Sequence, residues 1–465
     1  MTQRINVLCP IETIARELDF RLALAALFAR RRYRIFIGHA FAIYRLSRQI
    51  KGALLTGKHM MFPNARNPVE YRAAKANGAR VVFLGEEGAV FPTDPESLRH
   101  NLLYQIEPSQ FAPDDYLCTW GDLQREFYLR DAPAPDRVRT TGHPRFDLFR
   151  ERWRGLYAEE AEALKRRFGD FVLINSNFSW VANPEGMANS FSKEAFGYEV
   201  DDIPKRLAFV GAWARLARTL PAYVELVHKL AAARPDVTFV LRPHPTDDVE
   251  YYKGVFGGVS NIRVVREGTV APWLLACRVM IHDGCTTGLE AHLLGRPVVT
   301  YVPFPDPERE IYLPNVVGER CTTEQQAIEA VLGALEGREV GLGPVDDYPE
   351  LARRLFVNFE RKECFPGFLE VLEEAAATLS ATPAPSDRQL RAAEMASEAV
   401  ERAKSLVRPL SPRRYRSARM ARGKFPGFDR RAIARRLEVM RAITGNPVEL
   451  RFHSKNLFEI ESPRM

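Results

Sequence analysis

The segment Val237-Thr238-Phe239-Val240-Leu241-Arg242-Pro243-His244-Pro245 joins an apolar run to a short turn that contains an arginine and a histidine. Its apolar and β-branched residues form a run that is typical of a buried strand, and the run stops at two prolines. Because proline fixes φ, Arg242, His244 and Pro245 are expected to be held rigidly at the carboxyl end of the strand. An arginine offers a planar fork of donors and a histidine a directed donor, so the pair suits a phosphate. The alternative is that His244 only caps the strand turn.

A second stretch follows a strand in the same way. Val279–His282 leads into Asp283-Gly284-Cys285-Thr286-Thr287-Gly288-Leu289-Glu290-Ala291. Its glycines allow close approach of a ligand, and its threonines offer hydroxyls at a helix N-terminus, where free N–H groups favour an anion. Glu290 could accept hydrogen bonds from ribose hydroxyls; the alternative is an ordinary N-cap with a satisfied acid. Asn175 and Ser176 end an earlier strand at the same edge. The expected nucleotide-binding residues are therefore Arg242, His244, Pro245, Asp283, Gly284, Thr286, Thr287, Gly288, Glu290, Asn175 and Ser176.

Two adjacent acids end another apolar run, Val81–Gly85, in the N-terminal part of the chain. Acids at the end of a buried strand are costly unless they are solvated, paired or used. We expect Glu86 and Glu87 to be catalytic, acting as a base or a nucleophile at the sugar. The alternative is a solvated turn after the strand. Glu12 and Asp19 are further acids that could face the same site, although Asp19 is more simply interpreted as a helix cap.

Two other segments contain charged residues that could belong to the site. The segment Thr141–Asp147 lies where the two halves of the chain meet, and Arg145 and Asp147 are expected to pair and set a hinge. Lys58 follows the apolar run Leu54–Gly57 and either contacts an anionic acceptor or has no role.

Strands and helices alternate twice along the chain, and short apolar runs between amphipathic helices indicate parallel sheets. We expect an α/β protein with two doubly wound Rossmann-like domains facing a cleft. Residues 1–145 and residues 146–345 are the two expected domains; the resemblance described below implies that the first is the acceptor-side domain and the second the donor-nucleotide domain. Helices in residues 346–381 are expected to pack back near the cleft. A Pro/Ala/Ser linker then leads to a basic helical extension, residues 387–465.

The composition is that of a folded protein. The chain has 465 residues, 46% of them hydrophobic and 27% charged, which excludes global disorder. The six cysteines include no Cys-x-x-Cys pair, so we expect reduced thiols rather than a disulfide framework or a zinc ribbon. No apolar run approaches the roughly 18–20 residues of a membrane span. We expect a cytoplasmic protein that is at most peripheral to the inner face of the cytoplasmic membrane.

The positive charge is concentrated in one segment. Residues 401–440 contain thirteen Lys or Arg and three acids, a net +10, so the rest of the chain sums to about −3 within the total of +7. The segment is a solvated helix face, a nucleic-acid patch or a surface that docks on anionic lipid. Because the basicity is local, we favour the anionic membrane surface over nucleic acid.

The motifs together resemble those of known glycosyltransferases. Glu86-Glu87-Gly88 resembles the acid–acid–glycine motif of bacterial sialyltransferases and the acidic-glycine motif of capsule Kdo transferases. Arg242–Pro245 is similar to their His-Pro motif, in the form also seen in CDP-glycerol glycerophosphotransferases. Thr286–Ala291 is similar to their hydroxyl pair with a downstream Glu-Ala, and Gly142–Asp147 to their crossover segment. The stretch 1–345 as a whole looks like proteins called surface carbohydrate biosynthesis proteins.

The resemblance implies a GT-B glycosyltransferase that needs no metal or cofactor. Its donor would be a CMP-activated ulosonic acid, Kdo or a sialic-acid relative, and its acceptor a surface polysaccharide or lipopolysaccharide, lipid-linked or saccharide. By the same resemblance His244 holds the CMP phosphate, Thr286 and Thr287 support it, and Glu290 binds ribose. Glu86 would act at the acceptor hydroxyl or the anomeric carbon.

Two departures from the family pattern keep alternatives open. Cys285 stands where serine is common, and Ala89 replaces an aromatic residue after the glycine of the capsule motif. A UDP-sugar donor therefore stays possible. A UDP-sugar 2-epimerase shares the fold, and a non-catalytic nucleotide- or nucleic-acid-binding protein is the third interpretation.

Overall fold

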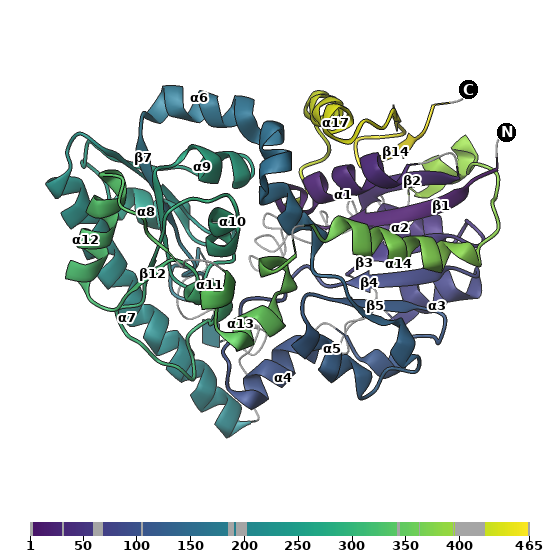
Figure 1. Cartoon of the computed structure of the whole chain (residues 1–465). Coiled ribbons are helices and arrows are strands. Elements are labelled where there is room, and N and C mark those ends of the chain that lie inside the picture. Colours follow the sequence, from purple (N-terminus) through teal and green to yellow (C-terminus); the bar gives the residue numbers. More distant parts are fainter. Residues whose placement is uncertain are drawn as a thin grey trace, which may run out of the picture. The chain divides into compact units, whose positions relative to one another are not determined.

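The chain folds into two compact units (Figure 1). Unit 1 consists of Met1–Gly88, Arg99–Leu148 and Arg353–Met465, and unit 2 of Ala89–Leu98 and Phe149–Ala352. The computed structural model describes residues 3–29, 32–58, 68–103, 106–184, 190–191, 202–341, 345–361, 363–393, 395 and 424–463. Each unit is built on one sheet of mainly parallel strands, which confirms the α/β class with two doubly wound Rossmann-like domains. Residues 89–98, expected in the first domain, belong to unit 2.

The sheet of unit 1 has the strand order β13-β14-β2-β1-β3-β4-β5-β6. Its strands are β1 (Ile5–Ile11), β2 (Tyr33–His39), β3 (Leu54–Gly57), β4 (Arg80–Leu84), β5 (Tyr116–Thr119), β6 (Val138–Thr140), β13 (Glu449–Phe452) and β14 (Leu457–Glu461). The strands β1 to β6 pair in parallel, whereas β14 pairs antiparallel with β2 and with β13. The direction of winding reverses between β1 and β3, as in flavodoxin-like sheets.

The strands of unit 1 are covered by helices on both faces. These helices are α1 (Ile14–Phe28), α2 (Ala40–Ser47), α3 (Pro68–Ala76), α4 (Pro95–Leu103), α5 (Asp122–Leu129), α14 (Phe365–Ala377) and α17 (Arg430–Thr444), where α4 crosses the boundary between the units. All seven residues of β1 are buried, which is why its sequence is nearly continuously apolar. Short 3-10 helices in the chain cover Pro108–Gln110, Pro135–Arg137, Pro144–Phe149, Glu151–Tyr157, Val345–Asp347 and Val357–Phe359.

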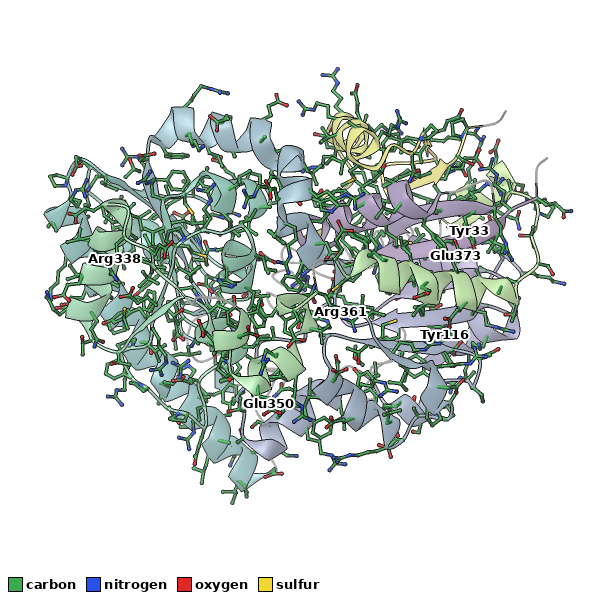
Figure 2. All side chains as sticks on the ribbon, viewed as in Figure 1. Tyr33, Tyr116, Arg338, Glu350, Arg361 and Glu373 are labelled. Atoms are coloured by element: carbon green, nitrogen blue, oxygen red, sulfur yellow. The ribbon has the colours of Figure 1, made fainter. Side chains whose placement is uncertain are left out.

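Helix α14 returns the chain to unit 1, where it packs on β3, β4 and β5. The hydroxyl of Tyr33 in β2 donates a hydrogen bond of 2.7 Å to Glu373 of this helix; both residues are labelled in Figure 2. At the start of the helix, the carboxylate of Asp147 accepts the backbone N–H groups of Cys364 and Phe365, each at 2.7 Å. Asp147 therefore satisfies two donors that a helix N-terminus leaves open.

The sheet of unit 2 has the strand order β12-β11-β10-β7-β8-β9, and all its strands pair in parallel. Its strands are β7 (Phe171–Asn175), β8 (Thr238–Arg242), β9 (Ile262–Val264), β10 (Val279–His282), β11 (Val298–Tyr301) and β12 (Glu319–Cys321). Its helices are α6 (Ala158–Phe168), α7 (Ile203–Ala233), α8 (Val249–Val255), α9 (Ala271–Ala276), α10 (Thr287–Leu293), α11 (Leu313–Val316), α12 (Glu324–Leu335) and α13 (Glu350–Leu355), the last of which crosses the boundary. This is the strand order of Rossmann folds, with its switch point between β7 and β10.

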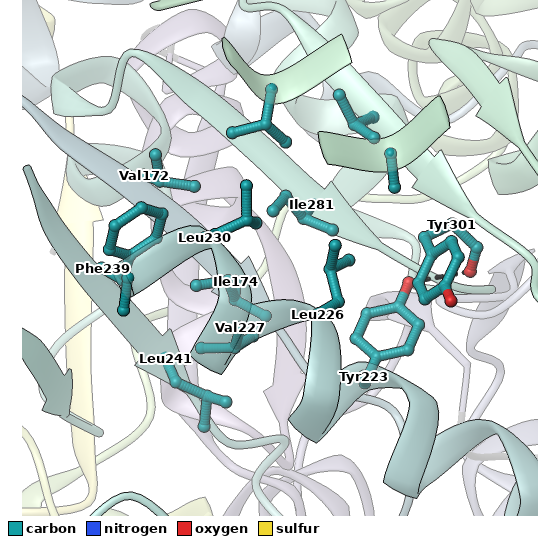
Figure 3. Close-up of a cluster of buried hydrophobic side chains, with 14 of the residues drawn as sticks. Val172, Ile174, Tyr223, Leu226, Val227, Leu230, Phe239, Leu241, Ile281 and Tyr301 are labelled. Atoms are coloured by element: carbon teal, nitrogen blue, oxygen red, sulfur yellow. Dashed lines mark hydrogen bonds between the residues drawn. The ribbon is translucent and has the colours of Figure 1, made fainter. Parts of the chain in front are cut away.

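One apolar cluster fixes where the strands of unit 2 end (Figure 3). Alternate residues of β7 and β8, such as Ile174 and Leu241, meet Leu226 and Leu230 on α7, and all four are 3% exposed or less. Burying such a side chain contributes roughly 1.5–3 kcal/mol each. This packing therefore fixes the positions of the carboxyl ends of β7 and β8 and of the loops that follow them.

Two expectations for particular segments were wrong, and a third is untested. The extension 387–465 is not helical throughout, because β13 and β14 add two strands to the sheet of unit 1. The first helix begins at Ile14, so Asp19 lies inside it and pairs with Arg436 at 3.3 Å instead of capping it. Residues 401–423 of the basic segment lie outside the described residues.

All six cysteines belong to the described part of the chain and are free thiols. Among the described helices, none has both the length and the apolar character to cross a membrane.

Candidate functional site

The loops after β7 and β10 meet at the switch point of unit 2. The side-chain amide of Asn175 donates a hydrogen bond of 2.9 Å to the hydroxyl of Thr287, the first residue of α10. Two residues on, the amide of Asn177 donates to the carbonyl of Gly284 at 3.0 Å. These two bonds join the strand ends that the sequence predicted to lie together.

His244 is held against the same loops by its backbone. Its N–H donates to the hydroxyl of Ser176 at 3.0 Å, which links the end of β8 to that of β7. Its ring Nδ1 accepts the N–H of Thr246 at 3.3 Å and lies 2.6 Å from the hydroxyl of the same residue. Because Nδ1 is an acceptor, we assign the proton of the neutral ring to Nε2, which makes that atom a directed donor.

Asp247 completes this network, and the sequence analysis missed it. Its carboxylate accepts the hydroxyls of Ser176 at 2.6 Å and Tyr252 at 2.9 Å. Burial raises the pKa of Asp247 to about 6, although these hydrogen bonds oppose the rise. An acid two residues beyond Pro245 carries no sequence signal of its own, because acids are common in loops.

Arg242 has a different role from the expected one. Its guanidinium donates to the backbone carbonyls of Glu267 at 2.6 Å and Gly268 at 3.4 Å, and it lies 4.9 Å from the ring centroid of Trp273. Burial lowers its pKa to about 10. Two of its N–H groups are bonded within the protein, so Arg242 holds the loop after β9 in place. The nearby Arg266 contacts the carbonyl of Pro245 at 3.2 Å.

The carboxylate of Asp283 likewise has its partners within the protein. It forms a buried ion pair with Arg215 of α7 at 3.0 Å and accepts the amide of Asn315 at 2.9 Å. The carbonyl of the same Asn315 side chain accepts the N–H of Gly284 at 2.7 Å. Asp283 thus holds the loop in place and is not presented to a ligand, contrary to the prediction.

The two glycines of this loop are required by packing. A Cβ on Gly288 would lie 2.3 Å from Nε2 of His282, and one on Gly284 would lie 2.8 Å from Cδ1 of Ile311. Gly284 also has φ +63°, which disfavours other residues. The positions that a side chain would take at these two glycines are filled by other side chains. Glu290 lies buried in the first turn of α10, while Thr286 just before this helix is half-buried.

In unit 1, Glu86 lies at the centre of a buried charge cluster beyond the end of β4. Its carboxylate is 3.1 Å from Nε2 of His143, 3.3 Å from Arg21 and 3.7 Å from Arg145. The other ring nitrogen of His143 accepts the N–H of Arg145 at 3.2 Å, so the proton on Nε2 points at Glu86. No sequence pattern indicated the roles of Arg21 and His143.

The electrostatics of this cluster favour an ionised acid and a neutral imidazole. Burial alone would raise the pKa of Glu86, but His143, Arg21 and Arg145 hold it well below its usual range. Burial lowers the pKa of His143 to about 4. The side chain of Glu86 has no exposed surface, so its placement is that of a counter-ion and not of a group that reaches a sugar.

Glu87 points outward from the same strand end. Its side chain is 52% exposed and pairs with Arg16 at 2.7 Å. Burial would raise the pKa of Glu87, and Arg16 and Lys58 lower it. Lys58 in turn lies 3.2 Å from both Glu12 and Glu17, so the switch point between β1 and β3 carries a linked set of charges.

Arg145 and Asp147, the expected hinge pair, each contact a different part of unit 1. Arg145 contacts Glu86, whereas Asp147 caps α14. Gly142 has φ +69°, and a Cβ on it would lie 2.4 Å from Sγ of Cys364. The motif at residues 142–147 therefore serves the packing of unit 1. Within the described ranges, no three His, Cys, Asp or Glu side chains gather closely enough to hold a metal ion.

No protein-family model and no curated protein matches the sequence. Among solved structures, the chain is similar to the UDP-GlcNAc 2-epimerase of Methanocaldococcus jannaschii in complex with UDP-GlcNAc and UDP (12% identity, TM-score 0.46, 79% of this chain and 99% of that chain). It is also similar to the wall teichoic acid polymerase TagF (13%, 0.38, 73% and 85%) and to Anabaena HepE in complex with UDP and glucose (12%, 0.43, 81% and 100%). At these identities and TM-scores, the similarity says nothing about the activity of this chain.

Proposed function

We propose that the protein is a GT-B glycosyltransferase that transfers a sugar from a nucleotide-sugar donor to a saccharide or lipid-linked acceptor. The observation that carries the proposal is the meeting of three strand ends at the switch point of unit 2, where Asn175 contacts Thr287 and Ser176 contacts His244. In open α/β sheets, ligands bind in the crevice at such a switch point.

The donor phosphate would bind at His244. Its Nε2–H is a directed donor because Thr246 occupies Nδ1, and Arg266 adds positive charge beside the carbonyls of this loop. Thr286, at the N-cap position of α10, would add a hydroxyl, and Glu290 would bind the ribose. Asn175 and Ser176 would act mainly by fixing the loops.

The donor that we favour is a CMP-activated ulosonic acid such as Kdo or a sialic-acid relative. The support is the resemblance of Glu86–Gly88 and Arg242–Pro245 to motifs of enzymes that use such donors. A UDP-sugar is the competing donor, since Cys285 and Ala89 depart from the family pattern.

Glu87 replaces Glu86 as the acid that we propose to act at the reacting groups. Its carboxylate is accessible, and Arg16 and Lys58 keep it ionised at neutral pH. An ionised carboxylate can accept a hydrogen bond from the acceptor hydroxyl and stabilise positive charge that develops at the anomeric carbon. Its lowered pKa makes it a weak general base, so we assign it orientation and charge stabilisation.

The acceptor of the sugar and the location of the enzyme in the cell are also proposals. A lipid-linked precursor of a surface polysaccharide or lipopolysaccharide would bring the enzyme to the cytoplasmic face of the membrane. The basic residues 401–440 would then contact anionic lipid.

A thermal-shift experiment with CMP, UDP and GDP tests the nucleotide site. A nucleotide at 100 times its Kd adds about 2.7 kcal/mol, which raises Tm by roughly 5–10 °C in a domain of this size. We expect CMP to give the larger shift and His244→Ala to abolish it, whereas His228→Ala on α7 keeps it. A shift with UDP alone contradicts the CMP donor, and no shift with any nucleotide contradicts the proposed function. Elongation of an acceptor glycan separates transfer from epimerisation, which needs no acceptor.

A further inference from the structure

Glu12, Lys58 and Lys424 form a group of charges at the carboxyl end of the parallel strands of unit 1. Nζ of Lys424 lies 3.2 Å from Oε1 of Glu12, and Nζ of Lys58 lies 3.2 Å from Oε2 of the same carboxylate. The two lysines come from distant parts of the chain, since Lys58 follows β3 and Lys424 belongs to the C-terminal extension. Two ammonium groups therefore hold one carboxylate between them, one at each oxygen.

Lys58 is the fixed member of this group. Its side chain is 7% exposed and also lies 3.2 Å from Glu17, whose side chain is 1% exposed. The carboxylate of Glu17 accepts the backbone N–H of Glu12 at 3.0 Å, which ties the end of β1 to α1. A buried charge needs such a partner. Lys58 therefore keeps a buried counter-ion even when the side chain of Glu12 turns away.

Aromatic contacts hold Lys424 at the end of β1. The ring of the next residue, Phe425, packs edge-on against His39 at the end of β2, with 4.7 Å between the centroids. It also lies 5.0 Å from the ring of Phe428, which is buried and contacts Phe458 of β14 at 4.8 Å. Farther along the chain, α17 packs on α1 (Figure 1). The C-terminal extension is thus placed by packing and not by the ion pair alone.

Glu12 is the replaceable member of the group. Its side chain is 39% exposed and that of Lys424 is 37% exposed, and an ion pair with this exposure stabilises a protein little. Glu12 lies in the bend between β1 and α1, so its side chain can rotate toward solvent while both elements stay in place. An anion from outside can then take the position between the two lysines.

We propose that Lys58 and Lys424 bind a phosphate group of the acceptor, and that the carboxylate of Glu12 takes this position when no phosphate is bound. The inference rests on the proposed function, because it names a chemical group of the proposed acceptor. A carboxylate ligand would compete on equal terms with a tethered carboxylate, whose effective concentration is about millimolar. A phosphate monoester carries about −1.5 to −2 charges and three oxygens, so it binds two ammonium groups better than Glu12 does.

The same charges lead to the acid that we propose to act on the acceptor. Glu17 lies 3.5 Å from Arg16, which lies 2.7 Å from Glu87. Burial would raise the pKa of Glu87, whereas Arg16 and Lys58 lower it, so Lys58 is close enough to act on this carboxylate. A phosphate held by Lys58 would therefore keep the acceptor near Glu87.

Calorimetric titration of the full chain with inorganic phosphate, without nucleotide, tests the inference. Lys424→Gln should weaken binding about threefold to tenfold, because it removes one of the two ammonium groups. Glu12→Gln should tighten binding about threefold to tenfold, because it removes the competing carboxylate and keeps the size of the side chain. Lys51→Gln is the matched control and should bind like wild type, since the exposed Lys51 precedes β3 whereas Lys58 follows it.

Several results would overturn the inference. Phosphate binding that Lys424→Gln and Glu12→Gln leave unchanged would belong to another site, and weaker binding by Glu12→Gln would give Glu12 a supporting role in the fold alone. Acetate that binds as tightly as phosphate would contradict the choice of phosphate. Because the titration uses no nucleotide, the expected pattern without any nucleotide-induced thermal shift would refute the proposed donor site and leave the phosphate site standing.

A competition experiment distinguishes the two sources of the phosphate. Glucose 6-phosphate carries it on a saccharide, and vesicles of phosphatidylcholine and phosphatidic acid carry it on a lipid. The source that displaces radiolabelled inorganic phosphate from the wild-type protein at the lower phosphate concentration is the one that the acceptor carries. Displacement by neither overturns the inference.

Discussion

The hydroxyl of Ser176 donates to the carboxylate of Asp247 over 2.6 Å. The same oxygen accepts the backbone N–H of His244, so one buried hydroxyl ties the end of β7 to the loop that carries the proposed phosphate ligand. The position of His244 thus depends on two residues that do not touch the proposed donor.

Ser176→Ala is expected to weaken nucleotide binding about fivefold, which corresponds to roughly 1 kcal/mol for one lost hydrogen bond that orders the loop. Calorimetric titration with the best nucleotide measures the effect. Ser260→Ala, at an exposed position of unit 2, is the control and should bind like wild type. Equal affinities for both variants would mean that the His244 loop does not need this bond.

Asp247→Asn is expected to change the pH dependence of stability. The pKa of Asp247 is raised from 3.8 to about 6 in the folded protein, so the native state holds this proton more tightly than the unfolded state. Its contribution therefore favours folding at low pH and is lost as pH rises from about 4 to 6, by roughly 3 kcal/mol. Urea unfolding from pH 4 to 7 should show this fall in wild type but not in Asp247→Asn. Parallel profiles would contradict the raised pKa.

Glu86→Gln and Glu87→Gln should affect different properties. Removing the charge of Glu86 leaves Arg21 and Arg145 without their buried partner, and we expect a loss of about 3 kcal/mol in unfolding free energy. Glu87→Gln, at a half-exposed position, should change stability by less than about 0.5 kcal/mol and reduce transfer. Denaturant unfolding and acceptor elongation measure the two effects. Full transfer by Glu87→Gln would remove Glu87 from the mechanism.

Phe458→Ala is expected to destabilise unit 1 by about 3–5 kcal/mol, because this side chain of β14 is fully buried beside β2. Its cross-strand neighbour Phe452 on the edge strand is only half-buried, so Phe452→Ala should cost clearly less. Comparable losses in chemical denaturation would show that the hairpin is not part of the sheet.

Gly142→Ala should cost about 1–3 kcal/mol. The backbone there has φ +69°, and the new methyl would meet Cys364. Gly155→Ala is a matched control, since nothing lies within 4 Å of a Cβ at that position and its φ is not positive. A thermal scan that finds the two variants equally stable would contradict the packing of Gly142.

The amino-acid sequence was enough to predict the buried parallel strands at whose ends the candidate residues lie, although it did not predict β13 and β14. Strand β10 occupies Val279–His282, as predicted, and β8 occupies Thr238–Arg242 within the predicted run. These elements follow from the spacing of apolar residues and from restrictions on φ, which act between neighbours along the chain. For the same reason the sequence placed His244 at the end of a buried strand.

The tertiary structure alone decided which polar side chains are available. Arg242, Asp283 and Glu86 were all expected to serve a ligand, yet their partners are the carbonyl of Glu267, Arg215 and Arg21. It also decided that β14 joins the sheet of unit 1, more than 400 residues after β2. Burial, ion pairing and strand addition depend on groups that are remote in sequence. A local sequence pattern therefore cannot identify the partner of a given side chain or strand.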